Sequence, residues 1–160
     1  MSLLKSELAT CLPSYLLASR KRVYDMLMDT RKNIGRAGMA LAIAYFGANG
    51  WTVNIPMNDT QWYDLVIEKD GIFKTVQCKG TNSKSNSIEI KSCGGTNGEV
   101  YDTVLNHPLD FLFCLDKNGN IYNIPVEELR KAGNTKSFSL RTVPTVNGQG
   151  FQTYKYLVNL

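Results

Sequence analysis

The sequence predicts an α/β fold with a central mixed β-sheet flanked by helices. The small and apolar run NIGRAGMALAIAYFGA, residues 33–48, has the length and composition of a helix packed on a sheet. Two later segments turn back on themselves, at Asp70-Gly71 and at DKNGN, 116–120, and such hairpins require antiparallel pairs. The apolar run DFLFCL, 110–115, needs cover on both faces, which is typical of a central strand. Together these observations favour a mixed sheet.

Length and composition predict one domain, residues 1–160. Hydrophobic residues make up 43% and charged residues 20% of the chain, which is ordinary for a globular protein. No stretch approaches the roughly 18 consecutive apolar residues of a membrane span, and no secretory leader is recognisable, so we expect no membrane partner and an intracellular location. The cysteines are widely spaced without a C-x-x-C pair, which indicates reduced thiols: Cys11, Cys78, Cys93 and Cys114.

The chain is expected to begin with helices. Residues 1–32 form a helical, basic segment that Pro13 interrupts. The helix over 33–48 should be largely buried and should stop at Asn49-Gly50.

Strands then follow in short succession. They are expected at 51–55, on both sides of Asp70-Gly71, at 87–92, at 110–115 and at 121–124. Pro125 opens a helix that runs to Ala132. Residues 33–130 thus form the core, and 131–160 carry short strands or a last helix.

The hairpin WYDLVIEKDGIFKTVQCKG, residues 62–80, carries a polar trio where apolar or neutral residues are usual. If Asp70-Gly71 forms a type I′ turn, Lys69 pairs with Ile72 and, further along, Asp64 lies opposite Gln77. Side chains alternate along a strand, so Gln77 and Lys79 share the face of Asp64. The trio can converge on one small ligand group, although a solvated polar face would show the same spacing.

This trio suits phosphodiester hydrolysis. A carboxylate, an amide oxygen and a main-chain carbonyl are hard oxygen ligands of the kind that Mg²⁺ accepts. A lysine side chain can orient or deprotonate an attacking water, the latter as its neutral amine, and its ammonium can offset the charge on the phosphate. The candidate catalytic residues are therefore Asp64, Gln77 and Lys79, and the candidate metal ligands are Asp64, Gln77 and the carbonyl of Cys78.

Positive charge is clustered in this chain of net charge +4. Clusters of this kind suit a polyanion such as nucleic acid, although a solvated helix face would look the same. The candidate DNA-contacting residues are Arg20, Lys21, Arg22, Arg31, Lys32 and Arg36, and beyond the hairpin Lys84 and Lys91.

Two further motifs frame the hairpin motif YDLVIEKDGIFKTVQCK. The run GRAGMALAIAYFGANGWTVNIP, 35–56, precedes it, and DFLFCLDKNGNIYNIPVEEL, 110–129, follows it. Over about residues 33–130, the motifs in this order resemble the PD-(D/E)XK nuclease superfamily. Within it they are similar to the small intron- or phage-encoded homing endonucleases that have Gln in place of the second acidic residue.

The resemblance implies a restriction-endonuclease-like core and Mg²⁺-dependent, site-specific cleavage of double-stranded DNA by a homodimer or homotetramer. It also implies catalytic roles for Asp64, Gln77 and Lys79. Met39 departs from the pattern, because members often carry a glutamate at this point of the helix. Either one metal ion suffices, or another carboxylate such as Glu68 or Glu89 substitutes, or the chain is an inactive DNA-binding relative. A Holliday-junction-type, structure-selective nuclease shares the fold and is the alternative enzyme.

Other chemistry-bearing side chains give weaker signals. His107 is the only histidine and precedes Pro108 without a nearby nucleophile, so a Ser-His-Asp or Cys-His hydrolase is not indicated. We expect Trp51 in the core, whereas three other aromatic residues could belong to the core or stack on DNA: Trp62, Tyr63 and Tyr101.

Overall fold

A computed structural model describes residues 31–58, 60–81, 87–90, 107–132, 138–144 and 151–160. The predicted N-terminal helical segment, 1–30, lies outside the described residues. The elements follow the order α2 (Arg31–Ala48), β1 (Thr52–Asn54), β2 (Leu65–Lys69), β3 (Ile72–Gly80), β4 (Ser87–Ile90), β5 (Phe111–Leu115), β6 (Ile121–Pro125), α3 (Val126–Lys131), β7 (Phe138–Arg141), β8 (Phe151–Gln152), the 3-10 helix η2 (Thr153–Tyr156) and β9 (Leu157–Val158).

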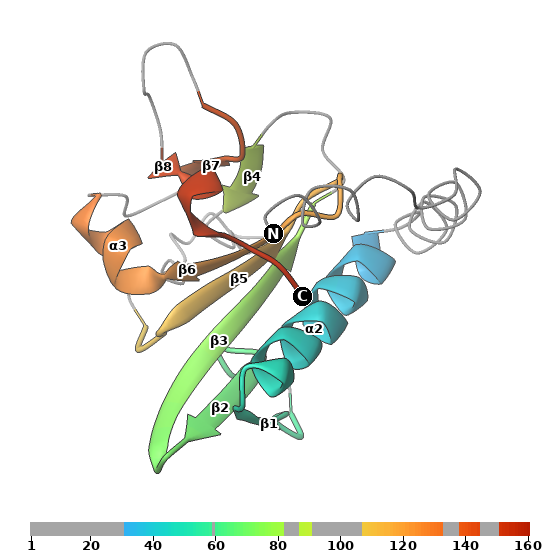
Figure 1. The fold of residues 1–160 in the computed structure, drawn as a ribbon, viewed down its shortest axis with the longest axis vertical. Helices are drawn as coiled ribbons and strands as arrows, with labels where there is room; N and C mark the ends of the chain where they lie inside the picture. Colours follow the sequence, from blue (N-terminus) through green and yellow to red (C-terminus); the bar gives the residue numbers. More distant parts are fainter. Residues whose placement is uncertain (1–30, 59, 82–86, 91–106, 133–137, 145–150) are drawn as a thin grey trace, which may run out of the picture.

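A six-stranded mixed sheet forms the centre of the fold, with the strand order β1-β2-β3-β5-β6-β9. β3 and β5 run parallel, whereas every other neighbouring pair in this sheet is antiparallel. β5 has apolar residues buried on both faces, which its sequence FLFCL predicts. The predicted mixed sheet is therefore confirmed, and Figure 1 shows α2 lying along β3 while α3 lies on the other side, near β6.

The β2–β3 hairpin has the predicted register. Lys69 pairs with Ile72 and Leu65 pairs with Val76. Asp70 and Gly71 have φ angles of 53° and 77°, as the two central residues of a type I′ turn require. The Gly71 N–H donates to the Glu68 carboxylate at 2.7 Å, which stabilises the turn. This turn sets which side chains of the two strands face each other.

One stripe of α2 packs on the sheet. Its buried positions recur every four residues, at Ile34, Gly38, Ala42 and Phe46, so they lie on one face of the helix. Gly80 of β3 permits close packing, because a Cβ there would lie 2.9 Å from the main-chain oxygen of Ile34. The prediction that this helix is largely buried is wrong, since alanine and glycine also make up its solvent-exposed face and residue size alone does not distinguish the two faces.

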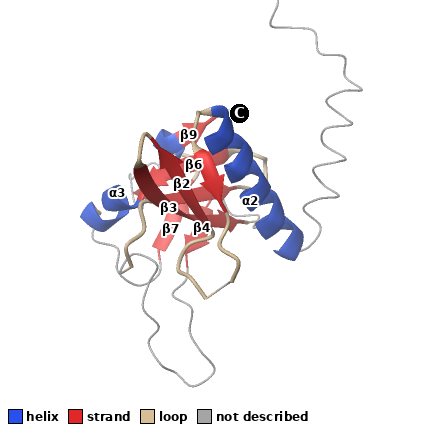
Figure 2. Cartoon of the chain, turned by 90° about the horizontal axis from the view of Figure 1, so that it is seen from below, coloured by secondary structure: helices blue, strands red, loops and turns tan. Residues whose placement is uncertain are grey.

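The other face of the sheet is covered mainly by the C-terminal half of the chain. A three-stranded sheet, β4-β7-β8, shares a core with α3 and the inner residues of β5 and β6. Figure 2 shows α2 and α3 on different sides of the strands. Within the described residues 138–144 and 151–160, the C-terminal part of the chain has short strands, β7, β8 and β9, and the 3-10 helix η2, so strands rather than a last α-helix are found there. Among the described residues, no helix is long and apolar enough to cross a membrane.

Candidate active site

Asp64 is anchored to β3 immediately before β2 begins. Its N–H donates to the main-chain oxygen of Val76 at 2.9 Å. Its Oδ2 accepts a short hydrogen bond from Gln77 Nε2 and a second one from the Cys78 N–H at 2.6 Å. The paired register ends at Leu65–Val76, and the hydrogen bond between the two side chains brings Asp64 and Gln77 together one residue beyond it. The carboxylate is therefore oriented by two donors from one strand.

The main-chain carbonyl of Cys78 points toward Asp64 and away from β5. The Thr81 N–H donates to Leu115 of β5 at 3.0 Å, whereas the Val76 carbonyl accepts from Asp64 on the opposite side of β3. Backbone groups alternate in direction along a strand, so the N–H and carbonyl of Cys78 point to the side of Val76. Gln77 Nε2 also lies 3.4 Å from the Cys78 oxygen. The Cys78 oxygen therefore lies on the same side of β3 as the side chains of Asp64 and Gln77, next to the residue that precedes β2.

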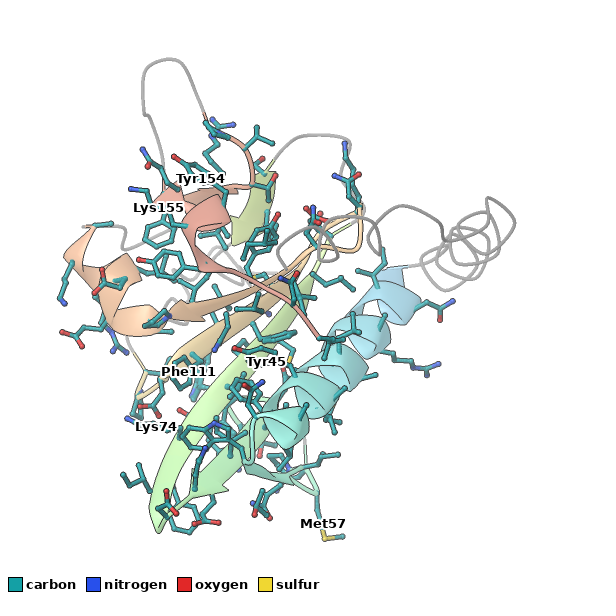
Figure 3. All side chains as sticks on the ribbon, in the orientation of Figure 1. Tyr45, Met57, Lys74, Phe111, Tyr154 and Lys155 are labelled. Atoms are coloured by element: carbon teal, nitrogen blue, oxygen red, sulfur yellow. The ribbon has the colours of Figure 1, made fainter. Side chains whose placement is uncertain are left out.

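The Asp64 carboxylate opens onto a pocket of about 360 Å³. Among the described residues, no hydrogen bond reaches its second oxygen, Oδ1. Met39 of α2 lines the same pocket, so the structure places this residue beside Asp64, where a glutamate would face the carboxylate. The rest of the lining comes from the segment between β1 and β2: Ile55, Pro56, Met57, Asn58, Gln61 and Tyr63. Figure 3 shows Met57 projecting from this segment.

Lys79 follows Gln77 by two positions on β3, so both side chains lie on the same face of the sheet. It is half-buried and pairs in register with Cys114 of β5. No hydrogen bond or ion pair links its ammonium to another residue in the described part of the chain. The ammonium thus remains available to an anion near Asp64.

The two thiols near Lys79 stay protonated. Burial strongly raises the pKa of Cys78, and the negative charge of Asp64 raises it further. Burial likewise raises the pKa of Cys114, and the positive charge of Lys79 offsets this only in part. A thiol with a raised pKa is a poor nucleophile and a poor metal ligand, so Cys78 contributes its carbonyl rather than its sulfur.

The oxygen donors fit a hard divalent cation. Asp64 Oδ1, the Cys78 carbonyl and the Gln77 amide are oxygen ligands of the type that Mg²⁺ accepts while it keeps several waters. Within the described ranges, no group of three or more His, Cys, Asp and Glu side chains could hold a metal ion. A site made from these residues would thus have one carboxylate and depend on neutral oxygens for its other protein ligands.

Other carboxylates are engaged elsewhere. Glu68 lies four residues from Asp64 along β2 and accepts from the turn at Gly71, so it is too distant to replace a missing ligand. The side chain of Glu89 lies outside the described residues. Asp116 is buried and accepts the hydroxyl of Tyr122 at 2.9 Å and the Asn118 N–H at 2.8 Å, which closes the turn after β5.

Of the predicted DNA-contacting residues, Arg36 is exposed on α2, one helical turn before Met39. Arg31 and Lys32 belong to the same helix, but their side chains lie outside the described residues, as do the remaining candidates: Arg20, Lys21, Arg22, Lys84 and Lys91. Among these candidates, the side chain of Arg36 is therefore the one that the structure describes.

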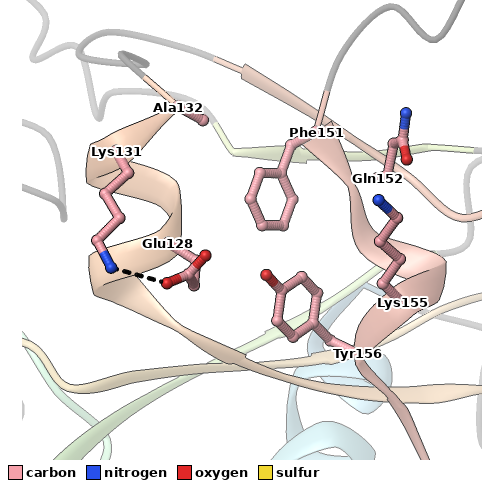
Figure 4. A pocket seen from close by; sticks show the side chains of 7 residues that line it. All are labelled: Glu128, Lys131, Ala132, Phe151, Gln152, Lys155 and Tyr156. Carbon is pink, nitrogen blue, oxygen red and sulfur yellow. Dashed lines mark hydrogen bonds and ion pairs between the residues drawn. The ribbon is translucent and has the colours of Figure 1, made fainter.

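A larger pocket, of about 580 Å³, lies away from the trio between α3 and η2. Figure 4 shows Glu128 and Lys131 of α3 facing Phe151 and Tyr156. Lys131 forms ion pairs with Glu128 at 3.0 Å and Glu127 at 3.1 Å, so both carboxylates share one cation. Burial and the nearby Glu128 raise the pKa of Tyr156. This arrangement offers no free carboxylate for the predicted chemistry.

The sequence did not predict how residues 55–63 and 107 are arranged around the site. Trp62 and His107 stack with ring centroids 3.6 Å apart and an interplanar angle of 9°. They are 45 positions apart in a chain without repeats, so no local pattern could pair them. Trp51 packs against the core below α2, as predicted. Tyr63 packs against the other core, and Tyr101 lies outside the described residues.

Comparisons with known proteins agree with this arrangement. A family model described as PD-(D/E)XK endonuclease matches residues 28–155. The solved structure of a bacterial homing endonuclease, I-Ssp6803I, is similar to this chain with a TM-score of 0.52 and 25% sequence identity, over 80% of this chain and 87% of that chain. No curated protein sequence matches the chain.

Proposed function

Because this chain belongs to the PD-(D/E)XK endonuclease family, we propose that it cleaves double-stranded DNA at specific sites in an Mg²⁺-dependent reaction at Asp64. The observation that carries the proposal is the one-sided bonding of the Asp64 carboxylate. Gln77 and Cys78 hold Oδ2, whereas Oδ1 accepts no hydrogen bond from the described residues and the carboxylate lines a pocket. The similarity to a bacterial homing endonuclease supports site-specific cleavage.

We assign each residue of the site a separate role in the reaction. Asp64, the Cys78 carbonyl and the Gln77 amide would hold the ion, and Gln77 also keeps the Asp64 carboxylate in position through its hydrogen bond. When bound there, Mg²⁺ supplies positive charge that stabilises the phosphate as it is attacked. As its ammonium, Lys79 would orient the attacking water and offset the charge that builds on the phosphate oxygens, whereas as its neutral amine it would take the proton of that water. In the reaction, the water oxygen bonds to phosphorus and one phosphorus–oxygen bond of the DNA strand breaks.

We also propose that the protein acts as a homodimer or homotetramer. Each chain supplies one Asp64 site, and one site acts on one strand at a time. Cleavage of both strands in a single encounter therefore requires at least two chains. Sedimentation of the protein with and without DNA measures the number of chains in the complex directly.

The test of the proposed function is incubation of the purified chain with plasmid, linear duplex and four-way-junction DNA, each with Mg²⁺ and with EDTA. We expect Mg²⁺-dependent cleavage of plasmids that carry the target site, at one fixed position. A plasmid library with random inserts provides the target, because the sequence of the site is unknown.

Other results would point to different functions. Cleavage restricted to four-way junctions would assign the chain to structure-selective nucleases. Tight DNA binding without cleavage under any metal condition would make the chain a DNA-binding relative that has lost activity, as Met39 in place of a glutamate would allow.

A further inference from the structure

An exposed tryptophan lies close to Asp64 in the chain. Trp62 is two residues before Asp64, and 45% of its surface is exposed. One face of its ring stacks on the imidazole of His107 at 3.6 Å. Since one face is covered in this way and nearly half of the residue remains exposed, the outer face of the ring is open to solvent. Exposure of so large an aromatic ring beside a reaction centre needs an explanation.

The His107 side of the stack is fixed to the protein on two sides. Its main-chain oxygen accepts from Arg130 of α3 at 2.6 Å and from the Leu109 N–H at 2.7 Å. The next residue, Pro108, accepts from the Thr75 hydroxyl of β3 at 3.0 Å. The main chain on both sides of the histidine ring is thus held by α3 and by the strand that carries Gln77 and Lys79.

The Trp62 side is fixed through its neighbours in the chain. Tyr63 packs against the core formed with β5 and β6, and Asp64 is bonded to β3. Both rings therefore keep a set position relative to Asp64. A platform that is ordered before its ligand arrives loses little conformational entropy on binding.

We propose that the outer face of Trp62 stacks on an unpaired DNA base next to the phosphate bound at Asp64, with His107 as the support behind the indole. Every base has a flat π-face, and stacking on an aromatic side chain is the usual way in which proteins hold an unpaired base. The guanidinium of the exposed residue Arg130, bonded to the main-chain oxygen of His107, adds positive charge close to the stack. The inference rests on the proposed function only for the identity of its ligand.

The test uses tryptophan fluorescence, because the chain has only two tryptophans. A dye-labelled 15-nucleotide oligothymidylate is the probe, since its bases need not be unpaired before they can stack. EDTA is present throughout, so binding is measured without cleavage. Trp51→Phe leaves Trp62 as the reporter, and Trp62→Phe is the matched variant that leaves the more buried Trp51. The difference between the parent and Trp62→Phe gives the same information if Trp51→Phe fails to fold.

We expect the probe to quench the emission of Trp62 and not that of Trp51. Trp62→Ala should weaken binding of the probe by about 5- to 150-fold, whereas Trp62→Phe should retain most of the affinity. Emission from Trp62 that stays constant while the labelled strand is bound would overturn the inference, as would a strand that does not bind.

The proposed function is tested separately, by cleavage with Mg²⁺. If the parent cleaves plasmid but Trp62 is not quenched, the stacking role is wrong and the nuclease function stands. Quenching by a protein that cleaves no DNA supports the stacking role and removes the nuclease function.

Discussion

Two aspartates lie on either side of β3, each one residue before a strand that pairs with it: Asp64 before β2 and Asp110 before β5. Both accept a main-chain N–H of β3, from Cys78 at 2.6 Å and from Thr75 at 2.8 Å. Asp110 also binds Lys74 Nζ through Oδ1 at 2.8 Å and the Thr75 hydroxyl through Oδ2 at 3.1 Å. Both of its oxygens are therefore used, and a cation compensates its charge.

The carboxylate of Asp64 is bonded differently. Its described partners, Gln77 and Cys78, are uncharged and bind one oxygen, while the carboxylate lines a pocket. Two carboxylates bound to the same strand thus differ in whether the described residues form hydrogen bonds with both carboxylate oxygens. The carboxylate of Asp110 links β5 to β3, whereas the carboxylate of Asp64 keeps one oxygen without a hydrogen bond from the described residues.

The largest expected effect is on cleavage by Asp64→Asn. The amide cannot supply the negative charge that a divalent ion requires, so we expect cleavage to fall by about 10⁴-fold, or about 5 kcal/mol in activation free energy. Initial rates on plasmid DNA at saturating Mg²⁺ measure this loss. Circular dichroism provides the control for folding, and a rate within a few-fold of the parent would remove Asp64 from the site.

Lys79→Ala should reduce cleavage by about 10²- to 10³-fold, because the ammonium serves the water and the phosphate but does not hold the ion. DNA affinity in EDTA should change little, since other basic residues share the contact with phosphates. Single-turnover rates and filter binding separate the two effects. Lys74→Ala is the matched control near Asp110, and the role assigned to Lys79 is wrong if both variants cleave equally fast.

Met39→Glu should make the Asp64 site more strongly acidic. A second carboxylate in the same pocket should raise Mg²⁺ affinity by about tenfold, or about 1.4 kcal/mol. Isothermal titration calorimetry measures the change, and Met39→Gln controls for the shape of the side chain. Equal affinities for the two variants would show that residue 39 does not reach the ion.

Asp110→Asn should lower stability rather than activity. The loss of the ion pair with Lys74 should reduce the free energy of unfolding by about 1 kcal/mol, a value already discounted because both side chains are about one-third exposed. Urea denaturation measures this change. Cleavage should stay within about twofold of the parent, and a large loss of cleavage would contradict a purely structural role for this aspartate.

The smallest expected effect is on the stability of the protein at acidic pH. Burial raises the pKa of Asp110, but the bonds from Lys74 and Thr75 outweigh it and lower the pKa below the ordinary 3.8. The folded state thus favours the ionised carboxylate, so its contribution to stability is complete above pH 3.8 and is lost as the pH falls through the folded-state pKa. The stability difference between the parent and Asp110→Asn should therefore shrink in acid. A difference that is constant from pH 6 to pH 2 would contradict this linkage.

The position of Asp64 beside Gln77 and Cys78 was predictable from the sequence because all three residues belong to one hairpin segment. The Asp70-Gly71 turn fixes the register of the hairpin, and the register places Asp64 beside Gln77 and Cys78. The α2 helix and the central strands were predictable from their apolar patterns for the same reason. The sequence does not predict which carboxylate oxygens accept hydrogen bonds. At Asp110 this depends on contacts with residues 35 or 36 positions away in the chain.

Other features depended on long-range pairing in the same way. Ser87 of β4 pairs with Arg141 of β7, and both strands are only four residues long, so no local signal linked them. The Trp62–His107 stack joins two loops whose meeting depends on the whole sheet. The exposed side of α2 was missed because alanine and glycine suit either environment.

The most direct test of the difference between the two aspartates is calorimetric titration of Mg²⁺ into the parent, Asp64→Asn and Asp110→Asn without DNA. We expect Asp110→Asn to bind Mg²⁺ like the parent and Asp64→Asn to lose at least about tenfold in affinity, because only Asp64 has an oxygen left for the ion. Unchanged affinity in Asp64→Asn, or equal losses in both variants, would contradict the assignment of the ion to Asp64.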